Sequence, residues 1–441
     1  MITEPISLKE TQLPKDALKS LYMVKRLKQG VWLYFWLLIF EGALRKWVLP
    51  GLSNPLLIVR DPIAIVVMLM AYRSGYFKVN GYIAFSIFIT FIAFITTLLF
   101  GHANLFVALY GARIMLIHFP FLFLIGRLFS FQDVIKIGTV LLWLSVPMTV
   151  LIAFQFYSPQ SAWVNRGIGG DMSGGGFSGA MGYFRPPGTF SFISGVVLFY
   201  GLTSIYVLYF WLDGRIKINK ILLISSTIAL IAALPLSISR SLFFTYCVGI
   251  LFAIMVVARK PRYLMRMLFA SIACVGILSL LESLAFFQTA TQAFTSRFEI
   301  ANASEGGVET TILNRFMAGS FDAINLEGED LIWGKGLGMG TNAGGKLLSG
   351  TQTFLISEGE WGRLIGENGL ILGLLAIIVR SHLLYKMNIS AYKSLRQKNI
   401  LSWLFLSFSF VPILQGQWAQ PTSLGFSVLA GGLLIASLKR Q

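Results

Sequence analysis

Apolar segments of about the length of a membrane helix recur along nearly the whole chain, separated by short polar turns. A bilayer core takes about 20 mostly apolar residues per helix. On that measure the pattern predicts an all-α, polytopic membrane protein that forms a single integral membrane domain over 1–441. The twelve predicted spans centre on residues 31–47, 55–72, 80–100, 104–126, 136–157, 189–211, 219–238, 241–258, 264–287, 361–380, 400–416 and 421–438.

Composition supports this class of protein. Hydrophobic residues make up 56% of the chain and charged residues only 12%, against about 25% charged in soluble domains. The net charge of +17 therefore raises the question of which membrane side each cation occupies, and no nucleic-acid partner is expected. Residues 1–28 are polar and basic and lack a signal-peptide core. They are expected to form a cytoplasmic tail, with the first helix retained as an anchor.

Two polar stretches are longer than the other turns, a Gly-rich loop at 158–188 and a larger loop at 288–360. Cytoplasmic loops carry an excess of Lys and Arg. With the N-terminus inside, the inner loops hold 24 of the 36 basic residues, Arg380 among them. An even number of spans then places both termini inside and both long loops outside, the larger one periplasmic.

The twelve basic residues left over lie mostly at or just inside the outer ends of the predicted helices. A charge within the apolar slab costs roughly 2.5–3.5 kcal/mol, so such residues usually line a cavity and find a partner. Arg also grips phosphate with two parallel hydrogen bonds. These residues predict an anion-binding cavity that opens outward. They are Arg45, Lys46, Arg60, Arg113, Arg166, Arg185, Arg240, Arg297, Arg315, Lys335, Lys346 and Arg363.

Arg45, Arg60 and Arg113 are the candidate walls of that cavity. The alternative for the stretch 41–62 is a simple hairpin cap between two helices, and Asp61 directly follows Arg60 and could neutralise it. For single arginines elsewhere, the alternative is a helix-end side chain that reaches the headgroup phosphates.

The polar groups needed for chemistry are concentrated in 296–369, which holds ten of the 19 Asp and Glu residues. Glu360, Arg363 and Glu367 are three and four residues apart and are expected to share one helical face. A carboxylate at the mouth of an arginine-rich cavity suits a general base, which makes Glu358 and Glu360 the candidates. The alternative is an internally neutralised helix cap.

Three further segments contribute candidate residues or turns. The Gly-rich loop lacks the Lys and Ser or Thr of a nucleotide loop and is expected to be a flexible lid, with Arg185 at a helix N-terminus that favours anions. Residues 310–324 show helical spacing of apolar residues and predict an amphipathic surface helix with Arg315 on its flank. WGKGLGMG (333–340) has no preceding strand and predicts a tight turn. The three histidines do not cluster with Cys or carboxylates, so no metal or cofactor is expected.

In their order, several of these motifs resemble the bacterial O-antigen ligase and O-antigen polymerase superfamily. The resemblance covers about the second half of the chain. It rests on Arg185-Pro-Pro-Gly-Thr-Phe190, Ser239-Arg240-Ser241, Arg315 within ILNRF, Gly334-Lys-Gly-Leu-Gly338 and the stretch from Glu358 to Glu367-Asn-Gly369.

The resemblance implies transfer of a glycan from undecaprenyl diphosphate to an acceptor sugar hydroxyl at the outer face of the bacterial inner membrane, without a metal. It assigns the diphosphate to Arg185, Arg240 and Arg315, with Arg363 as a further candidate. The ligases of the family place a His-Asn pair where this chain has Glu358 and Gly359. That departure favours a repeat-unit polymerase for an O-antigen, capsule or exopolysaccharide.

The leading hypothesis is therefore an inverting, metal-independent glycosyltransferase in which arginines stabilise the leaving diphosphate and Glu358 or Glu360 accepts the proton. Its expected partners are the undecaprenyl-diphosphate-linked oligosaccharide, membrane lipids, and chain-length regulator and flippase proteins. One alternative is a ligase that transfers a preformed glycan to another acceptor. The other is a transporter or flippase of a lipid-linked or anionic solute, a class that shows internal repeats, broken helices and charges near the bilayer midplane.

Overall fold

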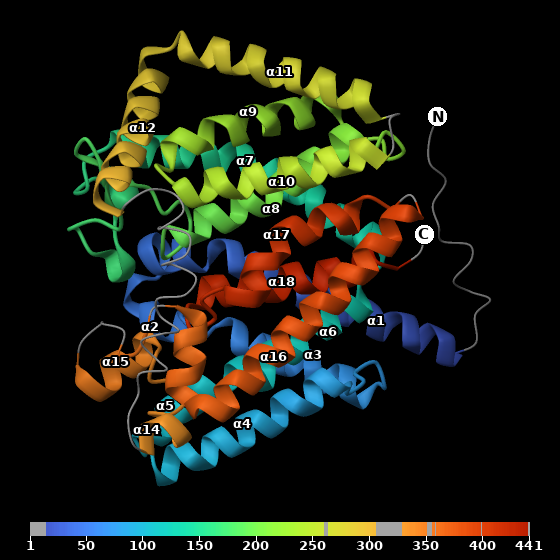
Figure 1. The fold of residues 1–441 in the computed structure, drawn as a ribbon, viewed down its shortest axis with the longest axis vertical. Coiled ribbons are helices and arrows are strands. Elements are labelled where there is room, and N and C mark those ends of the chain that lie inside the picture. Colours follow the sequence, from blue (N-terminus) through green and yellow to red (C-terminus); the bar gives the residue numbers. More distant parts are fainter. Residues whose placement is uncertain are drawn as a thin grey trace.

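The computed structural model describes residues 15–259, 263–305, 329–350, 355–357, 359–397 and 399–439. The fold is all-α and 78% helical, apart from an antiparallel hairpin of β1 (Phe177–Ala180) and β2 (Tyr183–Arg185). Figure 1 shows the longer helices running broadly alongside one another.

A helix lies over each of the twelve predicted apolar segments. The principal helices are α1 (Lys15–Ala43), α3 (Arg60–Arg73), α4 (Gly81–Leu99), α5 (Leu105–Arg113), α6 (Phe119–Leu128), α7 (Phe131–Tyr157), α8 (Ser194–Leu212), α9 (Lys220–Leu236), α10 (Arg240–Arg259), α11 (Leu264–Glu282), α12 (Ala285–Glu305), α16 (Glu360–Arg396), α17 (Leu401–Gln415) and α18 (Pro421–Ser437).

Shorter pieces connect these helices. They are η3 (Leu44–Val48), η4 (Pro50–Leu52), α2 (Ser53–Leu56), η5 (Ile114–His118), η6 (Trp163–Asn165), η7 (Ile168–Gly170), α14 (Glu329–Trp333) and α15 (Asn342–Ser349). The π-helical turn η5 joins α5 to α6 in one continuous stretch.

Within the described ranges, six helical stretches are long and apolar enough to cross a membrane, and a seventh is added if Pro50–Leu56 and Arg60–Arg73, bent by 42°, count as one span. The helices α9, α17 and α18 are apolar but shorter, at 10–17 residues. The protein is therefore a multi-pass membrane protein. The six stretches are Gly81–Leu99, Leu105–Leu128, Phe131–Tyr157, Ser194–Leu212, Arg240–Ala258 and Glu360–Arg396.

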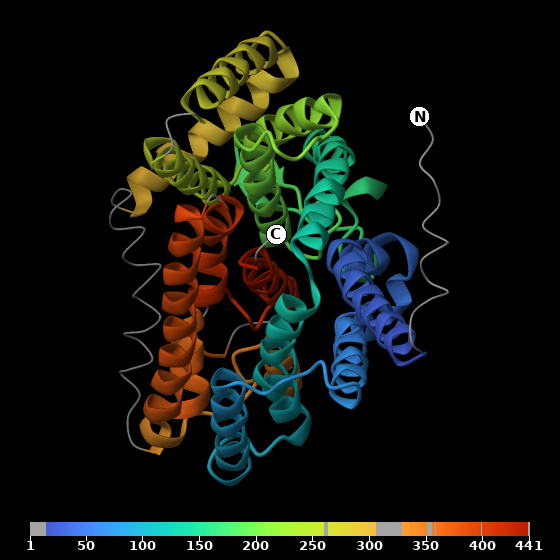
Figure 2. The same ribbon diagram turned by 90° about the vertical axis from the view of Figure 1, so that its right-hand side faces the viewer.

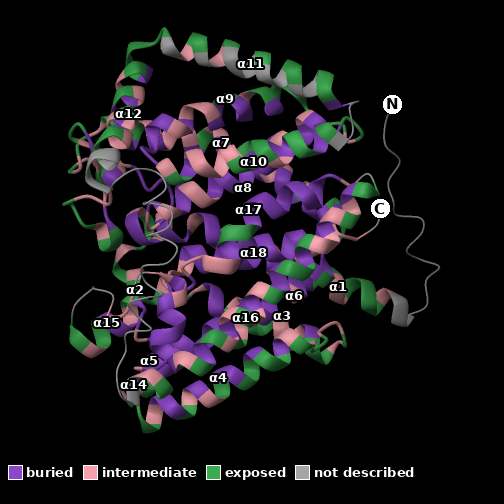
Figure 3. Ribbon diagram, viewed as in Figure 1, coloured by how far each residue is buried: buried purple, intermediate pink, exposed green. Residues whose placement is uncertain are grey.

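The core surrounds α18, whose residues are almost all buried, and Figure 3 shows burial falling off toward α4 and α11. Glycines let α18 approach α6 closely, as small residues do between membrane helices. A Cβ on Gly431 would lie 2.3 Å from Leu122 Cδ1, and one on Gly432 would lie 2.6 Å from Ile125 Cβ. Peripheral helices instead expose large apolar side chains, such as Phe88 and Phe91 of α4, as expected for lipid contact.

The two ends of the helix bundle differ. The start of α1 and the end of α18 lie at one end, here called the terminal end (Figure 1). The hairpin β1–β2, α2, α14 and α15 lie at the other, here called the loop end (Figure 1). The described parts of the two long loops therefore lie at the end opposite to the start of α1 and the end of α18.

Two predicted boundaries were wrong. The helix expected to end near residue 380 continues to Arg396, and the one expected to reach residue 287 ends at Glu282, where a short break precedes α12. The amphipathic helix predicted for 310–324 lies outside the described residues.

Candidate functional site

A glycine inside an apolar segment divides α16 into two arms. Gly369 has φ +76°, a left-handed conformation that other residues rarely adopt. The chain reverses there, so that the short arm (360–368) folds back on the long arm (370–396). A Cβ on Gly373 would lie only 2.6 Å from Ile365 Cα, which shows how tightly the arms pack.

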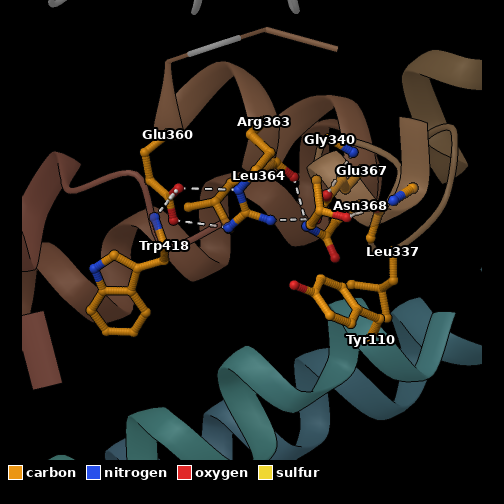
Figure 4. A network of polar contacts seen from close by, with 12 residues as sticks. Tyr110, Leu337, Gly340, Glu360, Arg363, Leu364, Glu367, Asn368 and Trp418 are labelled. Atoms are coloured by element: carbon orange, nitrogen blue, oxygen red, sulfur yellow. Dashed lines mark hydrogen bonds and ion pairs between the residues drawn. The ribbon is translucent and has the colours of Figure 1, made fainter. Parts of the chain in front are cut away.

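The reversal builds a buried ion-pair network, drawn in Figure 4. Arg363 donates from Nε and Nη2 to the two oxygens of Glu360, at 3.0 and 2.8 Å, and from Nη1 to Glu367. Arg380 on the long arm donates to Glu360 Oε1 at 2.5 Å, and its guanidinium lies 4.1 Å from the centre of the Trp418 ring. The backbone N–H of Trp418 donates to Glu360 Oε2 at 3.0 Å. We call Glu360, Arg363, Glu367 and Arg380 the carboxylate network.

These contacts confirm that Glu360, Arg363 and Glu367 share one helical face. They also favour the neutralised-cap alternative. Both oxygens of Glu360 accept hydrogen bonds, from Arg363, Arg380 and the Trp418 N–H. All three side-chain nitrogens of Arg363 donate to Glu360 or Glu367. Held in this way, Glu360 is poorly placed to accept a proton and Arg363 to bind a phosphate.

The predicted location of Arg380 was wrong. The positive-inside count placed it in an inner loop, but it is buried at 1% exposure and bound to Glu360. The partners are twenty residues apart, and only the reversal at Gly369 brings them together.

The segment WGKGLGMG confirms the predicted tight turn and shows what it packs against. The backbone N–H of Lys335 donates to Gly366 O at 2.8 Å, and that of Gly340 donates to Glu367 Oε1 at 2.9 Å. The turn therefore packs against the bend of α16 and donates a hydrogen bond to Glu367 of the carboxylate network.

A second buried group, here called the first-half cluster, combines charged and polar side chains. It contains Tyr34, Glu41, Arg45, Lys46, Arg60, Asp61, Arg113 and His118. Glu41 accepts hydrogen bonds from Arg45 at 3.2 Å and from Arg60 at 3.3 Å. Asp61 accepts two from Arg113 Nη1, at 2.8 and 2.9 Å. Arg60 does not pair with Asp61, although the two residues are adjacent in the sequence. Consecutive residues on a helix point in different directions, and each finds its partner on another element.

His118 links this cluster internally. Its Nε2 lies 2.8 Å from Asp61 Oδ1, and its Nδ1 lies 3.1 Å from the Tyr34 hydroxyl. The three side chains come from η5, α3 and α1. His118 sits in a π-helical turn, a geometry frequent at functional sites, and its place in a polar chain could not be inferred from its apolar sequence context.

Lys46 and Arg45 fasten the Pro-Pro-Gly-Thr-Phe segment to the first helix. Lys46 Nζ donates to the carbonyls of Gly188 at 2.6 Å and Phe190 at 2.9 Å, and Arg45 donates to Ser191 Oγ at 2.9 Å. A Cβ on Gly42 would lie 2.3 Å from Ser191 N. The end of the Gly-rich loop is thus held against α1 by backbone and side-chain contacts.

The four cations of the first-half cluster, Arg45, Lys46, Arg60 and Arg113, outnumber the two carboxylates, Glu41 and Asp61. Counting only the three arginines, which stay ionised, the cluster exceeds its carboxylates by one positive charge. Arg60 Nη1 and Arg113 Nη2 are buried and have no hydrogen-bond partner within the described residues. Uncompensated buried charge is costly, so this region favours an anion.

Arg185 lies in β2, nine residues before α8 begins at Ser194. Its expected place at a helix N-terminus is therefore wrong. A Cβ on Gly179 would lie 2.7 Å from Ile238 Cδ1 and 3.4 Å from Arg185 Cγ, so the hairpin touches the turn before Arg240, the first residue of α10. Arg185 is thus beside the Ser239-Arg240-Ser241 motif. The other predicted site residues, Arg315 and Glu358, lie outside the described residues.

The turn between α17 and α18 contacts both the carboxylate network and the first-half cluster. This role was not identified from the sequence. Besides the bond from Trp418 to Glu360, the carbonyl of Pro421 accepts a hydrogen bond from Arg60 Nη2 at 2.5 Å. The polar run Gln-Gly-Gln-Trp-Ala-Gln-Pro (415–421) between two apolar segments was the available signal.

Among the residues that the structure describes, no group of three or more His, Cys, Asp or Glu side chains could hold a metal ion. No family model matches the sequence, and no curated protein matches it.

Proposed function

We propose that the protein is a glycosyltransferase that polymerises lipid-linked oligosaccharide repeat units. The observation that carries the proposal is the contact between the Arg185 hairpin and the turn before Arg240, which brings two of the predicted diphosphate-binding arginines onto neighbouring elements. Preorganised cations in a site of low dielectric stabilise charge that develops on a leaving group. The negative charge that develops on a leaving diphosphate would be stabilised by such cations.

In the proposed reaction, a hydroxyl oxygen of the acceptor sugar attacks the anomeric carbon of the donor glycan. The new glycosidic bond forms as the bond from that carbon to the diphosphate oxygen breaks, and undecaprenyl diphosphate leaves with the bonding electrons. The hydroxyl proton passes to a carboxylate. Glu358 is the preferred acceptor because the oxygens of neighbouring Glu360 are engaged in the carboxylate network. Arg185, Arg240 and Arg315 would hold the diphosphate.

We place the protein in the bacterial inner membrane with twelve membrane-crossing helices, both termini in the cytoplasm and the loop end outside. The shared location of the start of α1 and the end of α18 and the three shorter apolar helices support this topology. The expected partners remain the lipid-linked oligosaccharide, membrane lipids, and chain-length regulator and flippase proteins.

The test is complementation of a deletion strain with Arg185→Ala, Arg240→Ala and Arg315→Ala, followed by measurement of polymer length and of lipid-linked intermediates. Each variant should shorten the product toward single repeat units while protein abundance in the membrane stays normal. Arg127→Ala is the matched control, because Arg127 is an exposed arginine on α6. Normal chain length in the Arg240 and Arg185 variants would refute the proposal.

A ligase is distinguished by its product, since it transfers one preformed chain without lengthening it. The transporter alternative gains support from the bent pair α2–α3, the broken helix α16 and the buried charges. A transporter would leave single lipid-linked units on the cytoplasmic side when it is deleted, whereas loss of a polymerase leaves them on the outer side. Accessibility of those units to an impermeant glycosidase separates the two functions.

A further inference from the structure

We propose that the turn between α1 and α3 and the start of the Gly-rich loop form one surface that inserts into the headgroup region of the bilayer. The turn covers residues 47–59, with η4 and α2, and lies at the loop end (Figure 1). The loop segment covers residues 163–168 and begins with η6. These two segments are here called the interfacial surface. Its partner is the lipid leaflet at the loop end, and Trp163 is its aromatic anchor.

The turn between α1 and α3 has the polarity of a segment in contact with lipid. Residues 47–59 contain no charged side chain, whereas a turn in water is normally polar. Val48 is 63% exposed and Leu52 is 51% exposed. The nearest charged residues on either side, Lys46 and Arg60, are buried instead. Because the charges lie inside and the apolar side chains outside, this turn marks a contact with a membrane or another protein.

The start of the Gly-rich loop packs on this turn. The rings of Trp47 and Trp163 are stacked with their centres 5.6 Å apart, and Trp47 Nε1 donates a hydrogen bond to Trp163 O at 3.0 Å. Farther along the loop, a Cβ on Gly170 would lie 3.2 Å from Pro50 Cβ. Trp163 is nevertheless 60% exposed, and Ile168 is exposed as well. Two segments far apart in the sequence therefore add exposed apolar side chains to one region of the molecule.

The interfacial surface continues the lipid-facing side of α3, which identifies the bilayer as its partner. Figure 2 shows α1 and α3, in blue, at one edge of the bundle. On α3 the side chains of Val66 and Leu69 are exposed, and Ile58 at the end of the turn is exposed too. Apolar exposure therefore runs from the turn into a membrane-crossing helix without an intervening exposed charge. The leaflet that covers α3 is expected to cover the turn as well.

The aromatic and charged residues of the loop indicate the depth of this surface. Trp is enriched where the bilayer meets water, because its ring is apolar and its N–H is polar. Arg166, which is half-buried and follows Trp163, belongs to a residue type that reaches headgroup phosphates from such positions. Asp171, after Ile168, is an exposed carboxylate. Polarity thus rises along the loop in the order expected of a segment that leaves the interface for water.

Both ends of the Gly-rich loop are fastened to the same turn. Trp163 stacks on Trp47, and the carbonyls of Gly188 and Phe190 accept hydrogen bonds from Lys46. A turn held in the headgroup region would therefore keep both ends of the loop near the bilayer surface. The same consequence holds for a ligase or a transporter with this fold, independently of the proposed glycosyl transfer.

The test measures depth with spin labels on the purified full-length protein, in which Cys247→Ala and Cys274→Ala remove the native thiols. Each labelled single-Cys variant is reconstituted into phosphatidylcholine vesicles. Power-saturation EPR then compares collisions of the label with oxygen, which concentrates in lipid, and with a nickel chelate, which stays in water. Phe88→Cys, at an exposed position of α4, is the lipid reference. Asp171→Cys, in the Gly-rich loop itself, is the water reference.

The labelled positions of the interfacial surface should give oxygen-to-nickel collision ratios several-fold above that of Asp171→Cys. Their ratios should stay below that of Phe88→Cys, because the headgroup region is shallower than the middle of a span. These variants are Val48→Cys, Leu52→Cys and Trp163→Cys. The first two leave the stacked indoles intact, so they decide the test if Trp163→Cys does not fold.

Ratios at Val48 and Leu52 equal to that of Asp171→Cys would overturn the inference, because the turn would then face water. Few collisions with either reagent, together with dipolar broadening between labels, would assign the surface to a second copy of the chain and would overturn it too. Normal polymer length in Arg240→Ala would refute the proposed function but would leave these collision ratios unchanged. The two proposals therefore fail by different measurements.

Discussion

Replacing Glu360 by Gln tests whether this carboxylate anchors the fold or performs the chemistry. The carboxylate accepts four hydrogen bonds, two from Arg363, one from Arg380 and one from the backbone N–H of Trp418. A glutamine keeps one acceptor oxygen and turns an NH2 group toward the remaining donors. Arg363 retains Glu367, but Arg380 loses the carboxylate it contacts.

Breaking a buried ion pair by removing one partner costs about 3–5 kcal/mol, because the other charge stays buried. For a chain of this length, a loss of that size should lower the midpoint of thermal unfolding by roughly 3–5 °C. The measurement is thermal unfolding of the purified protein in detergent. The double variant Glu360→Gln with Arg380→Gln removes the stranded charge and should recover part of the loss. Asp171→Asn changes an exposed carboxylate in the Gly-rich loop and should leave the midpoint unchanged.

The result that refutes this reasoning is a Glu360→Gln protein that unfolds at the wild-type temperature but makes no polymer. That outcome would make Glu360 the catalytic base and the network a means of positioning it. A destabilised protein whose residual folded fraction still extends the polymer would support the structural role.

Two further predictions concern the backbone and pH. Gly369→Ala should destabilise the protein by well over 1 kcal/mol, since a Cβ there would lie 2.1 Å from Ile332 O at φ +76°. Gly350→Ala, at φ +71° and ψ 0° with nothing within 4 Å, has neither the clash nor the glycine-restricted backbone of Gly369 at ψ 171°, and equal shifts in unfolding midpoint would contradict this account. Burial opposes ionisation of Asp213, but hydrogen bonds from the Arg215 side chain and backbone outweigh it and hold the pKa of Asp213 below its usual range. Because the folded-state pKa is depressed, this stabilisation is present above about pH 4 and is lost as the pH falls through the folded-state value. Wild-type protein should therefore lose more stability than Asp213→Asn between about pH 4 and pH 2 in unfolding scans, and parallel losses would contradict the assignment.

Several features followed from local sequence alone. Apolar run length located the helices, because a helix in a membrane must satisfy its backbone within one segment. The three- and four-residue spacing of Glu360, Arg363 and Glu367 fixed their shared face, since helical periodicity is a local property. The glycines of 333–340 likewise predicted a tight turn, although the surface on which it packs was not predictable.

The pairing of the buried charges was decided only by the tertiary structure. Arg380 meets Glu360 because one glycine reverses α16, yet a glycine inside a predicted span is also compatible with an unbroken helix. Asp61 pairs with Arg113 rather than with adjacent Arg60, and Lys46 binds carbonyls near Gly188, because helices distant in sequence pack side by side. Sequence determines which charges must be buried, since it places them within apolar segments. Which partners they bind, and which nitrogens stay unsatisfied, depends on long-range packing that local periodicity does not encode.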